Sequence, residues 1–72
     1  MTTTVDSVEQ RWWRLRAEQQ GLSMAAASSH IGITAEQLTA IEVTGDVSAL
    51  TDEQFRRAAE LYDVSIGFLR GF

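Results

Sequence analysis

The sequence contains no cysteine and no proline, all of its basic residues are arginines, and it has a single histidine, His30. The lack of cysteine excludes disulfides and thiolate metal sites, and one histidine is too few for a zinc site of the usual kind. We therefore expect no metal and no cofactor. The lack of proline leaves the sparse glycines as the main helix breakers.

Long apolar runs are also missing, since none approaches the roughly 20 residues that cross a membrane as a helix. The first ten residues, MTTTVDSVEQ, lack the positive and apolar regions of a signal peptide. These features predict a cytoplasmic protein. Ser, His and Asp are present, but no spacing groups them as a nucleophile system, and so short a chain leaves little room for a substrate cleft. An enzyme is not expected.

Positive charge is absent from the middle of the chain, because no arginine lies between Ala17 and Phe55. The same stretch carries six acidic residues: Glu18, Glu36, Glu42, Asp46, Asp52 and Glu53. Proteins that bind nucleic acid by neutralising phosphates usually present a basic patch. Here the arginines lie near both ends, and the centre is acidic.

The length of 72 residues and the hydrophobic fraction of 44% predict one small folded domain. We place this domain at residues 7–72 and expect residues 1–6 to form a flexible tail. A single core is only just large enough at this size. Because self-association would bury more surface, a homodimer or heterodimer is expected.

Capping residues and glycines divide the chain into five helices, with no strand pattern between them. Asp6 resembles the N-cap of a capping box that Glu9 completes. The other expected caps are Ser23, Thr34, Thr51 and Ser65. The predicted helices span about 7–19, 24–30, 35–44, 52–62 and 66–70, and the first has an apolar side formed by Val8, Trp12 and Leu15.

Six positions around the second and third helices have the spacing of a helix-turn-helix unit, in which two short helices cross steeply around a tight turn. Such a crossing needs a small residue in the first helix, a residue free to adopt unusual dihedral angles in the turn, and apolar residues on the second helix. The corresponding residues are Ser28, Gly32, Ile31, Ile33, Leu38 and Ile41.

With these residues in register, the chain resembles the lambda-repressor/Cro-like, or XRE, family of helix-turn-helix domains. Three segments carry the resemblance, which covers about Val8 to Gly71: RLRAEQQGLS, IGITAEQLTAIEVTG and FRRAAELYDVSIGFLRG. It implies an all-α, compact five-helix bundle with the lambda-repressor-like DNA-binding fold. It also implies an ion pair between Arg16 and Glu42.

Three departures from the family pattern add expectations. One extra residue follows Arg16 and another follows Glu42, so the two turns after them should be longer than usual. Ala27 stands where the family has leucine. We expect the indole of Trp12 to fill that space, because a methylene-sized void costs about 1 kcal/mol.

The resemblance also implies a reading face for operator DNA, beginning at the second helix and continuing along the third. Gln37 would pair with adenine, Glu36 would accept from the amino group of cytosine, and Thr39 would contact several base edges. The complete predicted face is Met24, Thr34, Ala35, Glu36, Gln37, Thr39, Ala40 and Thr44.

Two functions follow from these observations. The first is a small non-catalytic transcription regulator from a phage or other mobile element, which binds operator DNA as a dimer. The alternative is a degenerate helix-turn-helix module, an antirepressor or repressor modulator, which binds another regulator through its acidic third-helix face. Four further residues are candidate protein contacts, because Trp and Arg are favoured interface anchors: Arg11, Trp13, Arg14 and Phe72. No membrane partner and no small-molecule substrate are expected.

Overall fold

The computed structural model describes residues 7–71 and contains only helices, turns and loops in that range. The predicted flexible tail, the predicted N-cap Asp6 and the candidate contact Phe72 lie outside the described residues. The elements in chain order are α1 (Val8–Trp13), η1 (Arg14–Gln19), α2 (Met24–Ile31), α3 (Ala35–Thr44), α4 (Asp52–Tyr62) and α5 (Ile66–Arg70). The prediction of an all-α five-helix bundle is confirmed.

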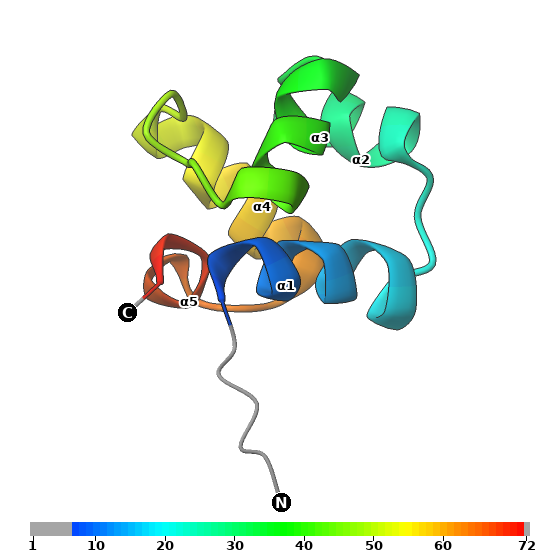
Figure 1. Cartoon of the computed structure of the whole chain (residues 1–72), viewed down its shortest axis with the longest axis horizontal. Helices are drawn as coiled ribbons and strands as arrows, with labels where there is room; N and C mark the ends of the chain where they lie inside the picture. The colour runs from blue at the N-terminus through cyan, green and yellow to red at the C-terminus, as the bar shows by residue number, and fades with distance from the viewer. Residues whose placement is uncertain (1–6, 72) are drawn as a thin grey trace, which may run out of the picture.

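The helices pack in two levels around α4 (Figure 1). α2 and α3 lie on one side, and α1 and α5 lie on the other. α4 contacts α2, and the Gln54 side chain in its first turn donates to the Gly32 carbonyl at 3.1 Å. α3 also contacts α1, and α5 contacts both α1 and α4. This arrangement leaves one long side of α3 without a covering helix.

The helix starts follow local capping chemistry. Thr34 and Thr51 each begin a reciprocal capping box, with Gln37 and Gln54 returning a hydrogen bond to the cap backbone. At α1 the prediction of Asp6 as the N-cap is wrong. Ser7 has the extended backbone of a cap, with φ −80° and ψ 162°, and its hydroxyl accepts from the backbone N–H of Gln10.

The first helix does not end early but widens after Trp13. In the π-helical turn η1, the N–H of Gln20 donates to the carbonyl of Leu15 at 3.0 Å, a bond across five residues. The chain after Arg16 therefore stays helical up to Gln19. The chain after Glu42 is likewise helical, because α3 continues to Thr44. The expectation of two turns longer than those of the XRE family stays a prediction.

The core gathers apolar side chains from every helix, and its largest fully buried members are Trp12, Tyr62, Ile31, Leu38 and Leu69. The Trp12 indole donates to the Leu69 carbonyl at 3.0 Å and meets the Tyr62 ring edge-on, with centroids 6.1 Å apart. These contacts direct the indole toward α4 and α5. Its predicted packing beside Ala27, which is also fully buried, stays a prediction.

Candidate interaction surface on α3

The junction between α2 and α3 is tight because of a small residue and a glycine. Ser28 is buried, its hydroxyl donates to the Ala25 carbonyl at 3.1 Å, and its own carbonyl accepts from the N–H of Gly32 and of Ile33. Gly32 has φ 90°, a value that glycine adopts without the steric strain of a side chain. The four apolar positions singled out by the sequence, Ile31, Ile33, Leu38 and Ile41, are all buried.

The C-terminal half of α3 is held on the first helix by an ion pair. Arg16 Nε donates to Glu42 Oε2 at 2.6 Å and Nη2 donates to Oε1 at 2.9 Å, which makes the pair bidentate. Nη1 of the same guanidinium donates to the Leu22 carbonyl at 2.8 Å. The side chains are only 13% and 5% exposed. Donating these hydrogen bonds to the Glu42 carboxylate raises the pKa of Arg16. This predicted pair is confirmed.

Tyr62 lies behind this ion pair, and its ring is 1% exposed. Burial, and secondarily the negative charge of Glu42, raise the pKa of the Tyr62 hydroxyl above its usual range. Among the described residues, Tyr62 Oη has no hydrogen-bond partner. The charge of Glu42 is therefore used inside the bundle, and it adds little to the outer surface of α3.

The outer face of α3 comprises its exposed residues, Ala35, Glu36, Gln37, Thr39, Ala40, Val43 and Thr44. Most of their polar groups already bond to the helix itself. Thr39 Oγ1 donates to the Ala35 carbonyl at 2.8 Å, and Thr44 Oγ1 donates to the Ala40 carbonyl at 2.7 Å. The carbonyl oxygen of the Gln37 side chain accepts from the Thr34 N–H at 2.9 Å. The face therefore presents mainly methyl groups, with Glu36 as its one charged residue.

The remaining predicted contact at the start of α2 is less accessible. Met24 is the first residue of α2 and is half-buried against the core. Its thioether cannot donate a hydrogen bond to phosphate. Thr34 is exposed, but its hydroxyl accepts from the Gln37 N–H as the cap of α3. The structure thus brings the predicted face together on α2 and α3, with few free hydrogen-bonding groups.

Comparison of the chain with protein-family models, curated proteins and solved structures finds no significant match. The chemistry of the surface is therefore the basis for any functional argument. Residues 7–71 contain no group of His, Asp or Glu side chains suited to a metal ion, and they enclose no pocket. No helix within this part of the chain has the length and apolar character needed to cross a membrane.

Val43 is the residue that the sequence interpretation missed. It is 68% exposed, more than any other large hydrophobic side chain that the structure describes. The signal was present in the helical spacing, since Val43 follows Glu36 by seven residues and Ala40 by three and so shares their side of α3. It was overlooked because the reading face was carried over from the family resemblance.

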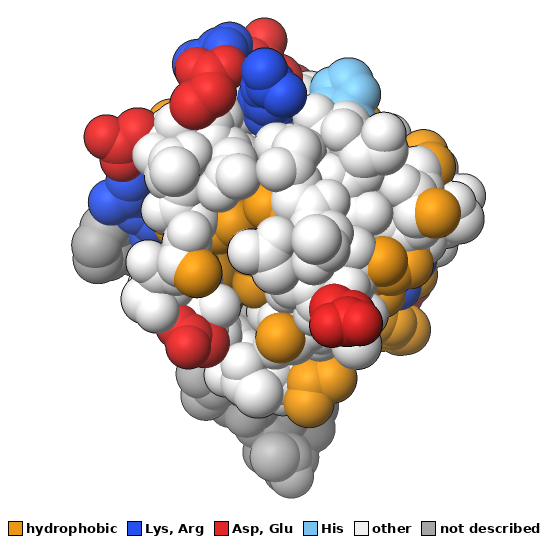
Figure 2. Space-filling model, turned by 90° about the horizontal axis from the view of Figure 1, so that it is seen from above, with side chains coloured by type: hydrophobic (Ala, Val, Ile, Leu, Met, Phe, Trp, Pro, Cys, Tyr) orange, Lys and Arg blue, Asp and Glu red, His pale blue; other side chains and the backbone are white. Residues whose placement is uncertain are grey.

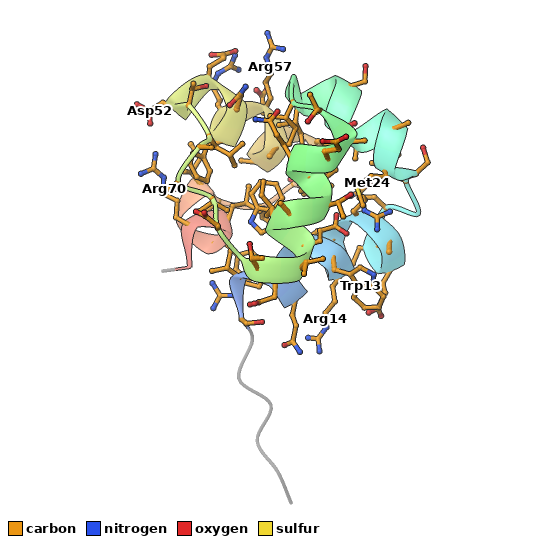
Figure 3. The ribbon with its side chains drawn as sticks, turned by 45° about the horizontal axis from the view of Figure 1, so that its top comes forward. Trp13, Arg14, Met24, Asp52, Arg57 and Arg70 are labelled. Carbon is orange, nitrogen blue, oxygen red and sulfur yellow. The ribbon has the colours of Figure 1, made fainter. Side chains whose placement is uncertain are left out.

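Trp13 is 45% exposed, in agreement with its position away from the apolar side of α1. The structure separates it from Arg11, which lies against α5. Arg11 Nη1 donates to the Phe68 carbonyl at 3.0 Å, and the guanidinium lies 4.7 Å from the centre of the Phe68 ring. Trp13, Arg14 and Met24 lie on one side of the molecule, away from Asp52 and Arg70 (Figure 3).

The two arginines of α4 are paired with glutamates of the same helix. Arg56 pairs with Glu53 and Glu60, and Arg57 pairs with Glu53 at 3.2 Å, at the three- and four-residue spacing of neighbours on a helix. Figure 2 shows that arginine side chains lie at the margin of the molecule as seen from above, together with acidic side chains, whereas most of the remaining face is uncharged or apolar. The arrangement offers little attraction to a polyanion.

Proposed function

We propose that this chain is a non-catalytic regulator of gene expression that acts by binding another regulatory protein through the outer face of α3. One observation carries the proposal. The exposed residues of α3 present methyl groups and a single carboxylate, Glu36, while both threonine hydroxyls bond to the helix backbone. Depletion of charge at the centre of a patch is typical of protein interfaces.

The scaffold supports a regulatory role through its resemblance to helix-turn-helix domains of the XRE type. The burial of Ser28 and of the four apolar positions, together with the left-handed backbone of Gly32, supports this resemblance. A fold does not define a function, so the resemblance gives only the class of process in which the protein acts. The class of partner is inferred from the exposed side chains of α3.

Operator DNA, bound by a dimer, is the second candidate because the same junction would project α3 outward. Gln37 Nε2 is not used in the capping box and remains able to donate to a base edge. The weak point of this candidate is its expected affinity for DNA. Phosphate neutralisation by Lys and Arg supplies most non-specific binding to DNA, and the outer face of α3 has neither residue. Protein binding is therefore the better supported function.

Titration into duplex DNA separates the two candidates. The wild-type protein is added to fluorescein-labelled mixed-sequence duplex at low salt, where electrostatic attraction is strongest. We expect no change in anisotropy at micromolar protein concentration. Micromolar binding that weakens steeply as salt is raised would contradict the proposal and favour the DNA-binding regulator.

A bacterial two-hybrid screen against a library of transcription regulators tests the protein partner directly. A partner that binds the outer face of α3 should be lost with Ala40→Gln, which adds a polar side chain at the centre of that face. It should be retained with the matched variant Ala49→Gln, because Ala49 is exposed in the loop before α4. Equal recovery with both variants would place the interaction elsewhere on the chain.

A further inference from the structure

The C-terminal half of α3 and the adjoining side of α1 form one surface. Glu9, Trp13 and Arg16 are spaced four and three residues apart, so they share one side of the first helix. Arg16 bonds to Glu42, and a methyl group placed on Gly45 would lie 3.3 Å from Glu9 Oε1. Along α1, Trp13 lies between the residues that make these two contacts, and along α3, Val43 lies between Glu42 and Gly45.

We call this surface the α1–α3 strip and define it by Trp13, Glu36, Ala40 and Val43. Three of its members lie on one side of α3, at intervals of four and three residues. Its apolar centre contains two of the three large hydrophobic side chains that are exposed among the described residues, Trp13 and Val43. Tryptophan is enriched among the few anchors that supply most of the affinity of a protein interface.

Carboxylates stand at both ends of the strip. Glu36 lies in the first turn of α3, whereas Glu9 and Asp46 lie beside and after its C-cap, Gly45. Nine residues separate Glu36 from Gly45, which is roughly 14 Å along a helix axis. Hydrogen bonds from Ser7 and Ser48 lower the pKa values of Glu9 and Asp46, respectively, so both are ionised at neutral pH.

We propose that the α1–α3 strip binds an amphipathic helix of a basic partner protein, with apolar side chains against Trp13 and Val43 and a lysine or arginine near each acidic end. This inference rests on the proposed protein-binding function and names the chemistry of the partner. A helix laid along α3 would place apolar residues at intervals of three and four, with basic residues about nine to ten positions apart.

The carboxylates at the ends of the strip favour a basic helix over a second copy of the chain or DNA. A second copy of the chain laid on the strip would bring the carboxylates of two strips together, in a protein whose net charge is already −4. DNA would meet the same carboxylates with phosphates, and no arginine lies on the outer face of α3 to offset them. A positively charged helix instead gains attraction at both ends and buries the apolar centre.

Two synthetic helical peptides provide the test. Each has about 18 residues with leucines along one face, as an amphipathic ligand requires. One carries two arginines ten positions apart at the flanks, and the control has glutamates at those two positions. Fluorescein anisotropy with the full chain should give a Kd about tenfold lower for the arginine peptide at low salt. That preference should shrink toward zero at about 0.5 M salt.

Variants of the full chain locate the binding site. Val43→Lys should weaken binding of the arginine peptide about tenfold, because it places a buried like charge at the interface. Ile66→Ser is the matched control, since Ile66 is 37% exposed on α5 and outside the strip; it should change the Kd less than twofold. Unchanged circular dichroism would show that both variants fold.

Each outcome has a defined reading. Equal binding of the two peptides, no binding of either, or equal loss with Val43→Lys and Ile66→Ser would overturn the assignment of a basic helix to this strip. The proposed function could survive that result, provided the two-hybrid screen still yields a partner that Ala40→Gln removes. Salt-sensitive binding of mixed-sequence DNA by the same protein would instead overturn the proposed function itself.

Discussion

Replacing Arg16 and Glu42 should measure how strongly their ion pair holds α3 against the first helix. The perturbation is a double-mutant cycle with Arg16→Met, Glu42→Leu and the double variant, in which both replacements are apolar and of similar length. The pair is bidentate, with distances of 2.6 and 2.9 Å, and its side chains are 13% and 5% exposed. Arg16 also bonds to the Leu22 carbonyl.

Removing one partner leaves a buried charge without its counter-charge, which destabilises proteins by about 3–5 kcal/mol. A domain of 72 residues has roughly 4–11 kcal/mol of stability in total at 0.05–0.15 kcal/mol per residue. Each single variant should therefore lose more than about a quarter of its free energy of unfolding. The double variant should lose only about 1 kcal/mol, chiefly because the Leu22 carbonyl loses a donor.

Urea unfolding followed by far-ultraviolet circular dichroism provides the measurement. An unchanged m-value across the four proteins would show that the same surface is exposed on unfolding in each case. With the losses given above, the interaction energy between the two positions is at least about 5 kcal/mol. A value below about 0.5 kcal/mol, typical of solvent-exposed pairs, would refute the view that this ion pair fastens α3 to the first helix.

Three further predictions concern individual groups. Tyr62→Phe removes a buried hydroxyl that has no hydrogen-bond partner among the described residues. Thermal unfolding of this variant should therefore show a stability that is unchanged or higher by up to about 1 kcal/mol. A clear loss of stability would mean that the hydroxyl is hydrogen-bonded. Gly45→Ala should destabilise more than Gly21→Ala, because both residues have positive φ but only Gly45 has Glu9 within 4 Å of an added methyl group; equal urea midpoints would contradict this. The lowered pKa values of Glu9 and Asp46 give stability that is present above the usual carboxyl range and is lost as pH falls through the lowered values. Asp46→Asn should therefore flatten the acid limb of the stability–pH curve, and an unchanged limb would count against it.

Much of the fold could be predicted because its signals are local. Caps at Ser23, Thr34, Thr51 and Ser65 and a terminating glycine at Gly45 act within one helical turn, so the residues themselves define the boundaries. The Asp6 cap was wrong for a related reason. Asp6 and Ser7 are both good N-cap residues, and the choice between them depends on where the packed helix begins.

The candidate face was only partly predictable from the sequence. Its position on α3 follows from helical periodicity and the resemblance, and the lack of positive charge is visible in the residues themselves. The sequence does not show whether a threonine hydroxyl on this face is free to bond to a partner. Thr39 and Thr44 were expected to be available for contacts, but both donate to the backbone of their own helix. That choice depends on side-chain rotamers, which the sequence does not specify.

The sequence by itself determined the helical class, most helix ends and the absence of basic residues from α3, because each depends on residue type and short-range spacing. The tertiary structure alone decided that the first helix widens into a π-helical turn after Trp13. It also decided that Glu42 is paired with Arg16 inside the bundle and that Trp13 and Val43 stay exposed. These features depend on which helices meet, since a side chain's charge and apolar surface are available to a partner only where no neighbouring helix covers them.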